Sequence, residues 1–105
     1  MDAPLQKLIK ESATVVATTT FVLVEALDLQ GGEDVLEIGT GSGYAAAVLS
    51  RIARNVYTVE RIAQLAEKSA STLATLGYAN VHVLHADGTR GWPEHAPYDA
   101  IVVAA

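Results

Sequence analysis

The sequence contains no cysteine, which excludes disulfide bridges, thiolate nucleophiles and cysteine-ligated metals. Its three histidines, His82, His85 and His95, lack both the spacing and the cysteine neighbours of a metal site, so we expect no bound metal. A chain without cysteine suits a reducing compartment, and we expect a cytoplasmic protein.

Basic residues are also scarce, since seven lysines and arginines stand against twelve acids and give a net charge of −5. They are scattered, whereas nucleic-acid binders carry a basic stripe that neutralises phosphates. Long hydrophobic runs are lacking as well. The most apolar stretch, 13–24, is interrupted by Thr18, Thr19 and Thr20, is followed by Glu25 and is too short to cross a bilayer. We therefore expect neither nucleic acid nor a membrane as a partner.

What the sequence does have is apolar content: half of its 105 residues are hydrophobic and only 18% are charged, which predicts a single folded domain rather than disorder. From residue 31 onward, short apolar runs alternate with helical patterns. They predict strands at 35–38, 56–59, 81–84 and 98–104, and helices at 43–53 and 62–76. Gly77 stands where a helix-ending glycine belongs, and Arg51 and Arg54 fall in the last turn of the first helix.

This alternation is typical of a parallel sheet with right-handed crossovers. We predict an α/β fold, a truncated Rossmann-like domain with a four-stranded parallel sheet of order 3-2-1-4 and flanking helices. Residues 31–105 would form the core and residues 1–30 an N-terminal helical segment. Within that segment, β-branched residues favour a strand, but helical spacing of the apolar residues favours a helix at about 16–28, which we adopt.

A glycine-rich turn lies between the first predicted strand and helix. It reads Glu37-Ile38-Gly39-Thr40-Gly41-Ser42-Gly43. Glycines at such a turn let a ligand lie against bare backbone, and a helix N-terminus suits an anionic group. The third glycine falls one residue earlier than in the dinucleotide-binding G-x-G-x-x-G pattern. The G-x-G-x-G spacing is instead typical of S-adenosylmethionine-dependent methyltransferases, although a glycine turn without ligand has the same appearance.

Acids end the next two strands. Glu60 stands where doubly wound folds place a carboxylate that accepts hydrogen bonds from ribose hydroxyls; the alternatives are an ion pair with Arg61 or a solvated strand end. Asp87 would accept from an adenine amino group while Gly88 lets the ring approach, although Asp-Gly is also a common turn.

The acid inside the first strand, Glu37, either meets the ammonium of the cofactor or is satisfied by N–H groups of the loop. Trp92 is expected to anchor the core beneath its loop. The predicted cofactor-binding residues are Glu37, Gly39, Thr40, Gly41, Ser42, Gly43, Glu60, Arg61, Asp87 and Gly88.

Four segments resemble the protein-L-isoaspartate O-methyltransferase family: VLEIGTGSGY (35–44), VYTVER (56–61), LGYANVHV (76–83) and DGTRGWPEHAPYDAIVVA (87–104). The run GWPEHAPYD is the most specific of them, and the similarity covers about residues 22–105. The resemblance implies a doubly wound fold that binds S-adenosyl-L-methionine, releases S-adenosyl-L-homocysteine and methylates the carboxylate of isoaspartyl residues in damaged proteins.

Two departures from the family pattern bear on activity. The serine that the resemblance implies as the main catalytic residue falls on Val15, or on Val16 with a one-residue gap, so no catalytic residue is assigned. The chain also ends at the fourth predicted strand, which we expect to leave an open edge through which two copies pair. Three hypotheses follow: a methyltransferase domain impaired in this fragment, a non-catalytic cofactor-binding module, or a self-associating structural module.

Overall fold

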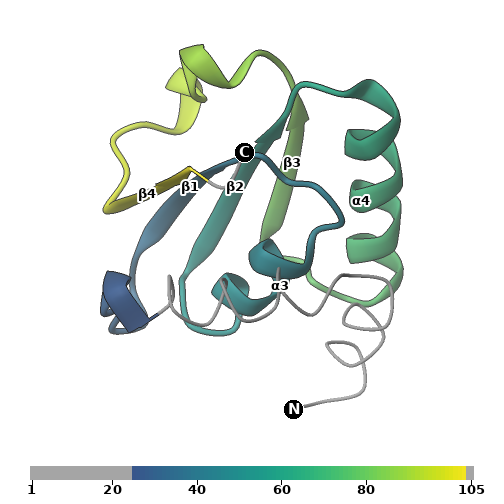
Figure 1. Cartoon of the computed structure of the whole chain (residues 1–105). Helices are drawn as coiled ribbons and strands as arrows, with labels where there is room; N and C mark the ends of the chain where they lie inside the picture. Colours follow the sequence, from purple (N-terminus) through teal and green to yellow (C-terminus); the bar gives the residue numbers. More distant parts are fainter. Residues whose placement is uncertain (1–24, 104–105) are drawn as a thin grey trace.

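The computed structural model describes residues 25–103 (Figure 1). Its elements in chain order are β1 (Asp34–Ile38), α3 (Tyr44–Ser50), β2 (Asn55–Glu60), α4 (Ala63–Thr75), β3 (Val81–His85), the 3-10 turns η1 (Gly88–Arg90) and η2 (Pro93–His95), and β4 (Ala100–Val103). The strands and both helices follow the predicted order.

The four strands form one parallel sheet of order β3-β2-β1-β4, which confirms the predicted fold (Figure 1). Glu37 of β1 lies opposite Thr58 of β2 on one side and Val102 of β4 on the other. All four strands run in one direction, so their carboxyl ends meet at one edge of the sheet. Ligands of open α/β sheets bind at that edge.

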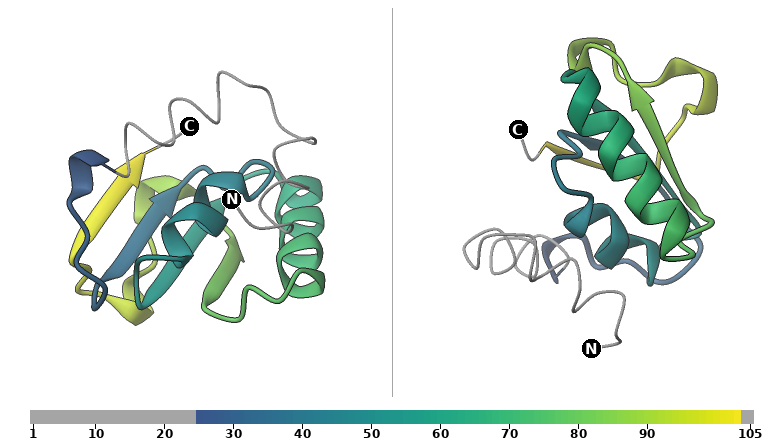
Figure 2. Two further views of the ribbon diagram at one scale, coloured as in Figure 1. Left: turned by 90° about the horizontal axis from the view of Figure 1, so that it is seen from below. Right: turned by 90° about the vertical axis from the view of Figure 1, so that its right-hand side faces the viewer.

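Both described α-helices cover the same face of the sheet. Ala46 and Leu49 of α3 pack with Val35, Val56 and Val102. A second cluster joins Tyr44, Ala47 and Val48 of α3 to Leu73 and Tyr78, with Val81 and Val83 packed against it. Side chains two residues apart on a strand share a face, so these clusters lie on a single side of the sheet. Figure 2 shows the two helices layered against the strands.

On the opposite face, the long connection from β3 to β4 folds over β2. Instead of a crossover helix it contains only η1 and η2, in keeping with its weak helical pattern. The ring of Tyr57 is stacked on His82 and on His95, with centroids 4.9 and 4.3 Å apart. Half-buried Trp92 meets Tyr57 edge-on, so it anchors the connection as expected.

One detail of the predicted helices is wrong. Helix α3 ends at Ser50, so its last turn contains no basic residue; Arg51 is its C-cap and Arg54 lies beyond it. Arg54 instead pairs with Asp34 at the start of β1, with 2.6 Å between Nη2 and Oδ2. This pair holds the pKa of Asp34 below its usual range. A nearby carboxylate attracts the guanidinium more strongly than partial charges at a helix end.

Only the last turn of the predicted helix at 16–28 is described. Residues 25–27 are helical, and Asp28 has a left-handed φ of 49°, which ends the helix at the predicted place. The rest of that prediction, with Val15 and Val16, lies outside the described residues. Across residues 25–103, no helix is long and apolar enough to cross a membrane.

The outer strand β4 carries two exposed apolar side chains, Ile101 (60%) and Val103 (69%), while Val102 between them is buried. Pairing of two copies along this strand stays a prediction. A variant that tests it has to change Ile101 or Val103, because Val102 belongs to the core.

Candidate functional site

A cavity of about 280 Å³ opens at the carboxyl ends of β1 and β2. It is lined by Ile38, Gly39, Gly41, Val59, Glu60, Arg61, Ile62, Leu65 and Gly88. Five of these residues are among the ten predicted for cofactor binding: Gly39, Gly41, Glu60, Arg61 and Gly88. Residues from three separate parts of the sequence therefore meet at the edge of the sheet where the fold places ligands.

The glycine loop, residues 39–43, is shaped by three left-handed glycines: Gly39, Gly41 and Gly43 have φ values of 99°, 55° and 91°. Only glycine adopts such angles without strain. Their N–H groups donate to Val59 O, Glu60 Oε1 and Thr40 O at 2.8, 2.9 and 3.0 Å. These three N–H groups therefore already have protein acceptors.

The glycines around the cavity have different reasons to lack a side chain. A Cβ on Gly88 would lie 2.4 Å from Ile38 Cγ2, and one on Gly43 would lie 3.1 Å from Leu73 Cδ1. Packing alone accounts for those two glycines. A Cβ on Gly41, which lines the cavity, would meet nothing within 4 Å. Gly41 is thus the glycine whose bare backbone leaves room for a ligand.

The carboxylate of Glu60 ties the loop to the end of β2. Its Oε1 accepts from Gly41 N at 2.9 Å, and its Oε2 accepts from Ile62 N at 3.0 Å. These two backbone hydrogen bonds, rather than the ion pair with Arg61 considered from the sequence, hold the Glu60 carboxylate in place. The two backbone donors fix the carboxylate at the cavity wall, and each oxygen keeps acceptor capacity because a carboxylate offers about four lone-pair sites.

Asp87 lies at the rim and acts as a turn cap. Its Oδ1 accepts from Thr89 N at 3.0 Å, and this backbone hydrogen bond lowers the pKa of Asp87. The Asp-Gly turn considered as an alternative is therefore present. The same turn brings Gly88, but not Asp87, into the lining of the cavity.

Glu37 lies beneath the glycine loop and is fully buried. Its Oε1 accepts from the Thr58 hydroxyl at 2.6 Å, and Thr58 Oγ1 is 2.6 Å from Thr40 Oγ1. Its Oε2 has no hydrogen-bond partner. Burial raises the pKa of Glu37 to about 7; the charge of Glu60 acts in the same direction, and the Thr58 hydrogen bond opposes them. Of the two partners considered for Glu37, no loop N–H contacts it in the described structure; the Thr58 hydroxyl on the neighbouring strand does.

Three residues escaped the sequence interpretation. Ile62 and Leu65 are 42% and 38% exposed and form an apolar wall of the cavity. The available signal was a pair of apolar residues, two and five positions after the strand-ending acid Glu60. No sequence signal marked Thr58, because the importance of its hydroxyl depends on the strand register that places it opposite Glu37.

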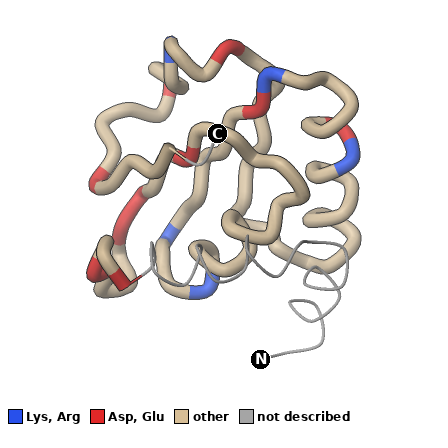
Figure 3. The backbone as a smooth tube through the Cα atoms, in the orientation of Figure 1, with Lys and Arg blue, Asp and Glu red and all other residues tan. Residues whose placement is uncertain are grey.

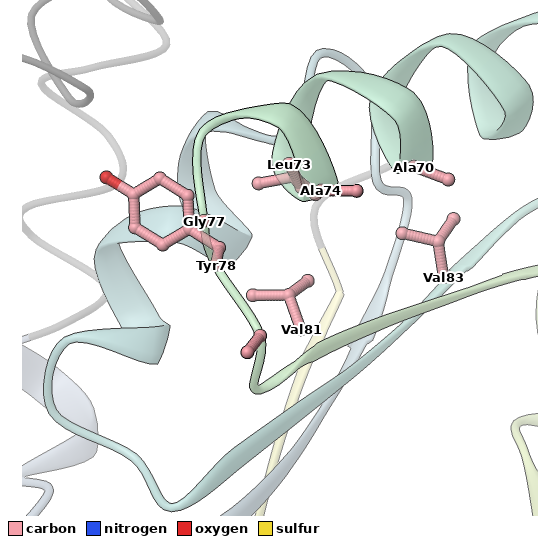
Figure 4. Close-up of a pocket in the computed structure, with 8 residues that line it drawn as sticks. Ala70, Leu73, Ala74, Gly77, Tyr78, Val81 and Val83 are labelled. Atoms are coloured by element: carbon pink, nitrogen blue, oxygen red, sulfur yellow. The ribbon is translucent and has the colours of Figure 1, made fainter.

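The other polar groups of residues 25–103 form neither a metal cluster nor a basic stripe (Figure 3). In the described part of the chain, no cluster of three metal-ligating residues occurs. The lysines and arginines among residues 25–103 are scattered, without a basic stripe (Figure 3). A second cavity, of about 320 Å³, lies between α4 and β3, where Ala70, Leu73 and Ala74 lie opposite Val81 and Val83 (Figure 4). It contains no charged group that would recognise an amino acid or a ribose.

Parallel strands in the order 3-2-1-4, with a glycine loop after the first and an acid ending the second, define a Rossmann-like methyltransferase fold. The family model of protein-L-isoaspartate(D-aspartate) O-methyltransferase matches residues 1–105, and the chain belongs to that family. S-adenosyl-L-methionine is the cofactor of this class of enzymes.

Individual relatives agree with the family model. A protein-L-isoaspartate O-methyltransferase of Rhodopseudomonas palustris (strain ATCC BAA-98 / CGA009) is 68% identical over 84 residues, which are 80% of this chain and 38% of that protein. Protein-L-isoaspartate O-methyltransferase 1 of strain HaA2 is 66% identical over 83 residues, 79% of this chain and 34% of that protein. A solved protein-L-isoaspartate O-methyltransferase superposes with a TM-score of 0.80 at 36% identity, covering 85% of this chain and 29% of the other. The chain thus spans little more than a third of its curated relatives.

Proposed function

We propose that this chain is the cofactor-binding part of a protein-L-isoaspartate O-methyltransferase and that it binds S-adenosyl-L-methionine in the cavity beside the glycine loop. The observation that carries the proposal is the pairing of Gly41 with Glu60. Gly41 has no side chain that would fill the cavity, and its N–H donates to the Glu60 carboxylate at the same place. Residues 1–105 would form one domain, with 1–30 as its N-terminal helical segment.

The lining residues suit the parts of this cofactor. Glu60 would accept hydrogen bonds from the ribose hydroxyls with the lone pairs that its backbone donors leave. Ile62 and Leu65 offer apolar surface to the adenine ring, and Asp87 at the rim would accept from the adenine amino group. Glu37, beneath the loop, would attract the ammonium group. When bound, the cofactor supplies a methyl group already activated on a sulfonium, so the protein's part is chiefly positioning.

The first test is stabilisation by ligand. S-adenosyl-L-homocysteine should raise the melting temperature of the chain, because a ligand that binds only the folded state stabilises it by about 2.7 kcal/mol at a hundredfold excess over Kd. Gly41→Ala should abolish the shift. Gly77→Ala is the matched control, since Gly77 also has a left-handed φ and open space around its Cβ position but lies outside the cavity. Absence of a shift in the unmodified chain at millimolar ligand would refute the proposal.

The second test concerns Glu60. Glu60→Ala should weaken binding by about 1.5–3 kcal/mol, because a carboxylate acceptor for two hydroxyls is lost. Calorimetric titration measures it, with Glu67→Ala on the exposed side of α4 as control. A 2′,3′-dideoxy analogue of the ligand separates the role in ribose binding from the role in holding the loop. Equal weakening for normal and dideoxy ligands would contradict ribose recognition.

Catalysis by this chain is a separate question, because valine stands at the position of the family's serine. We expect no transfer of labelled methyl groups to an isoaspartyl peptide above the level with a normal aspartyl peptide. Val15→Ser and Val16→Ser are the variants that restore a hydroxyl under either alignment. Isoaspartate-specific turnover by the unmodified chain would contradict this expectation and favour an active methyltransferase over a non-catalytic binding module.

The broader setting follows from the family. An isoaspartyl protein as methyl acceptor, a role in protein repair and a cytoplasmic location are proposals that rest on membership alone. Self-association is a further proposal, supported by the exposed Ile101 and Val103 on β4.

A further inference from the structure

Three side chains connect the interior of the sheet to the glycine loop through a continuous hydrogen-bonded chain. Glu37 Oε1 is 2.6 Å from Thr58 Oγ1, which is 2.6 Å from Thr40 Oγ1. Glu37 and Thr58 are completely buried, and Thr40 is 4% exposed. Thr40 lies between Gly39 and Gly41, and its carbonyl accepts from Gly43 N at 3.0 Å. The hydrogen-bonded series of side chains therefore ends at Thr40, whose backbone also takes part in the hydrogen bonding of the glycine loop.

The number of hydrogens in this chain allows two arrangements, because each hydroxyl has one proton to donate. With Glu37 ionised, Thr58 must donate to Glu37 and Thr40 must donate to Thr58, so the Thr40 hydrogen points inward. With Glu37 protonated, the Oε2 position offers no acceptor for the proton. The proton is best placed on Oε1, donating to Thr58. Thr58 then donates to Thr40, and the Thr40 hydroxyl is released to donate elsewhere.

Few charged groups act on this chain. Among the described residues, Glu60 at the end of β2 exerts a like-charge effect on Glu37. The neighbour of Glu37 on β4 is Val102, which is apolar. Helix α3 has one titratable residue, Tyr44, and its side chain packs in the hydrophobic cluster with Leu73 and Tyr78. Protonation of Glu37 is thus governed by burial, by the Thr58 hydrogen bond, by Glu60, and by any cation that enters the loop.

We propose that Glu37, Thr58 and Thr40 form a proton relay in which ionisation of Glu37 sets the direction of the Thr40 hydroxyl, and so the hydrogen-bonding polarity of the glycine loop. Thr58 is a positioning residue: it connects the acid to the loop without lining the cavity. An ionised Glu37 gives the loop a nearby negative charge and an inward-pointing Thr40 hydrogen, an arrangement that favours a cationic amino group over an anion.

A consequence follows for the ligand, and it rests on the proposed function. A ligand with an ammonium group in the loop should favour ionised Glu37 and expel its proton. In the folded protein without ligand the pKa of Glu37 is about 7, so at neutral pH about half of the molecules carry the proton on Glu37. Ligand binding should expel that proton, which amounts to about half a proton released per ligand bound.

The relay is tested without ligand. Glutamate side chains of the full chain are labelled with ¹³C at the carboxyl carbon, the Glu37 signal is assigned by its loss in Glu37→Gln, and its titration is followed. Thr58→Val should raise the midpoint by about one pH unit, since a direct donor is lost. Thr40→Val should also raise it, by on the order of half a pH unit, although Thr40 does not touch Glu37. Thr40→Ser keeps the hydroxyl and should leave the midpoint unchanged. A midpoint insensitive to Thr40→Val would overturn the relay.

The coupling to ligand is tested by calorimetry with S-adenosyl-L-homocysteine in buffers of different ionisation enthalpy. We expect proton release in the unmodified chain and none in Glu37→Gln. Equal proton release in both would overturn the coupling. No binding at all would refute the proposed function and the coupling with it, whereas the ligand-free titration would still decide the relay.

Discussion

Replacing Leu73 with alanine is expected to lower the free energy of unfolding by about 2–5 kcal/mol, the usual range for a fully buried leucine. Leu73 is 2% exposed and is where α4 meets α3, in the cluster with Tyr44, Ala47 and Tyr78. Its side chain also packs where a Cβ of Gly43 would stand. The cavity left by the missing atoms would therefore loosen the helix pair and the end of the glycine loop together.

Leu65→Ala on the same helix is the matched control, because Leu65 is 38% exposed and should cost far less. Urea unfolding of both variants measures the difference. Gly43→Ala adds a further check, because the new Cβ would contact Leu73 and would also sit on a left-handed φ. Combining it with Leu73→Ala should relieve the steric contact but not the backbone strain at residue 43. Equal losses for Leu73→Ala and Leu65→Ala would contradict the packing described here.

The second large effect concerns pH. Stability of the folded chain should fall by up to about 3 kcal/mol as the pH rises from about 4.5 to about 7, because of Glu37 alone. The ordinary pKa of this carboxyl is 4.5, and burial raises it to about 7 in the fold. Between these values the folded state binds more protons than the unfolded state, so raising the pH favours unfolding. Above the folded pKa, Glu37 is charged in both states and its contribution becomes constant.

Glu37→Gln should remove this part of the pH dependence, because the amide does not titrate. Urea unfolding at several pH values between about 4 and about 8 measures it. Glu67→Gln, on the exposed side of α4, is the control and should leave the slope as it is in the unmodified chain. A slope that persists in Glu37→Gln would show that other groups carry the pH dependence.

Much of the fold was accessible from the sequence because it depends on local patterns. Apolar runs of strand length separated by helical periodicity gave the four strands, and the glycine loop gave the point where a ligand would lie. The order β3-β2-β1-β4 is that of the doubly wound fold, which the alternation of strands and helices predicts. Boundaries were less accurate: α3 ends before Arg51, because the helical pattern by itself does not show that Arg54 has a stronger partner in Asp34.

Tertiary structure decided the rest of the site. The sequence marked Glu37, Gly41, Gly43, Glu60 and Gly88 alike as candidates, but only packing shows that Gly43 and Gly88 make room for Leu73 and Ile38 while Gly41 faces open space.

The role of Glu37 is the clearest case. Residue type suggested a partner in the loop or the cofactor, whereas strand register supplies Thr58, a residue with no motif of its own. The sequence by itself determined which residues are polar and where the chain turns. The distances between strands, and therefore which polar groups are buried together, are set by the packing of the whole sheet. Because the pKa of a carboxyl depends on that burial and on its partners, its chemistry could be assigned only from the three-dimensional structure.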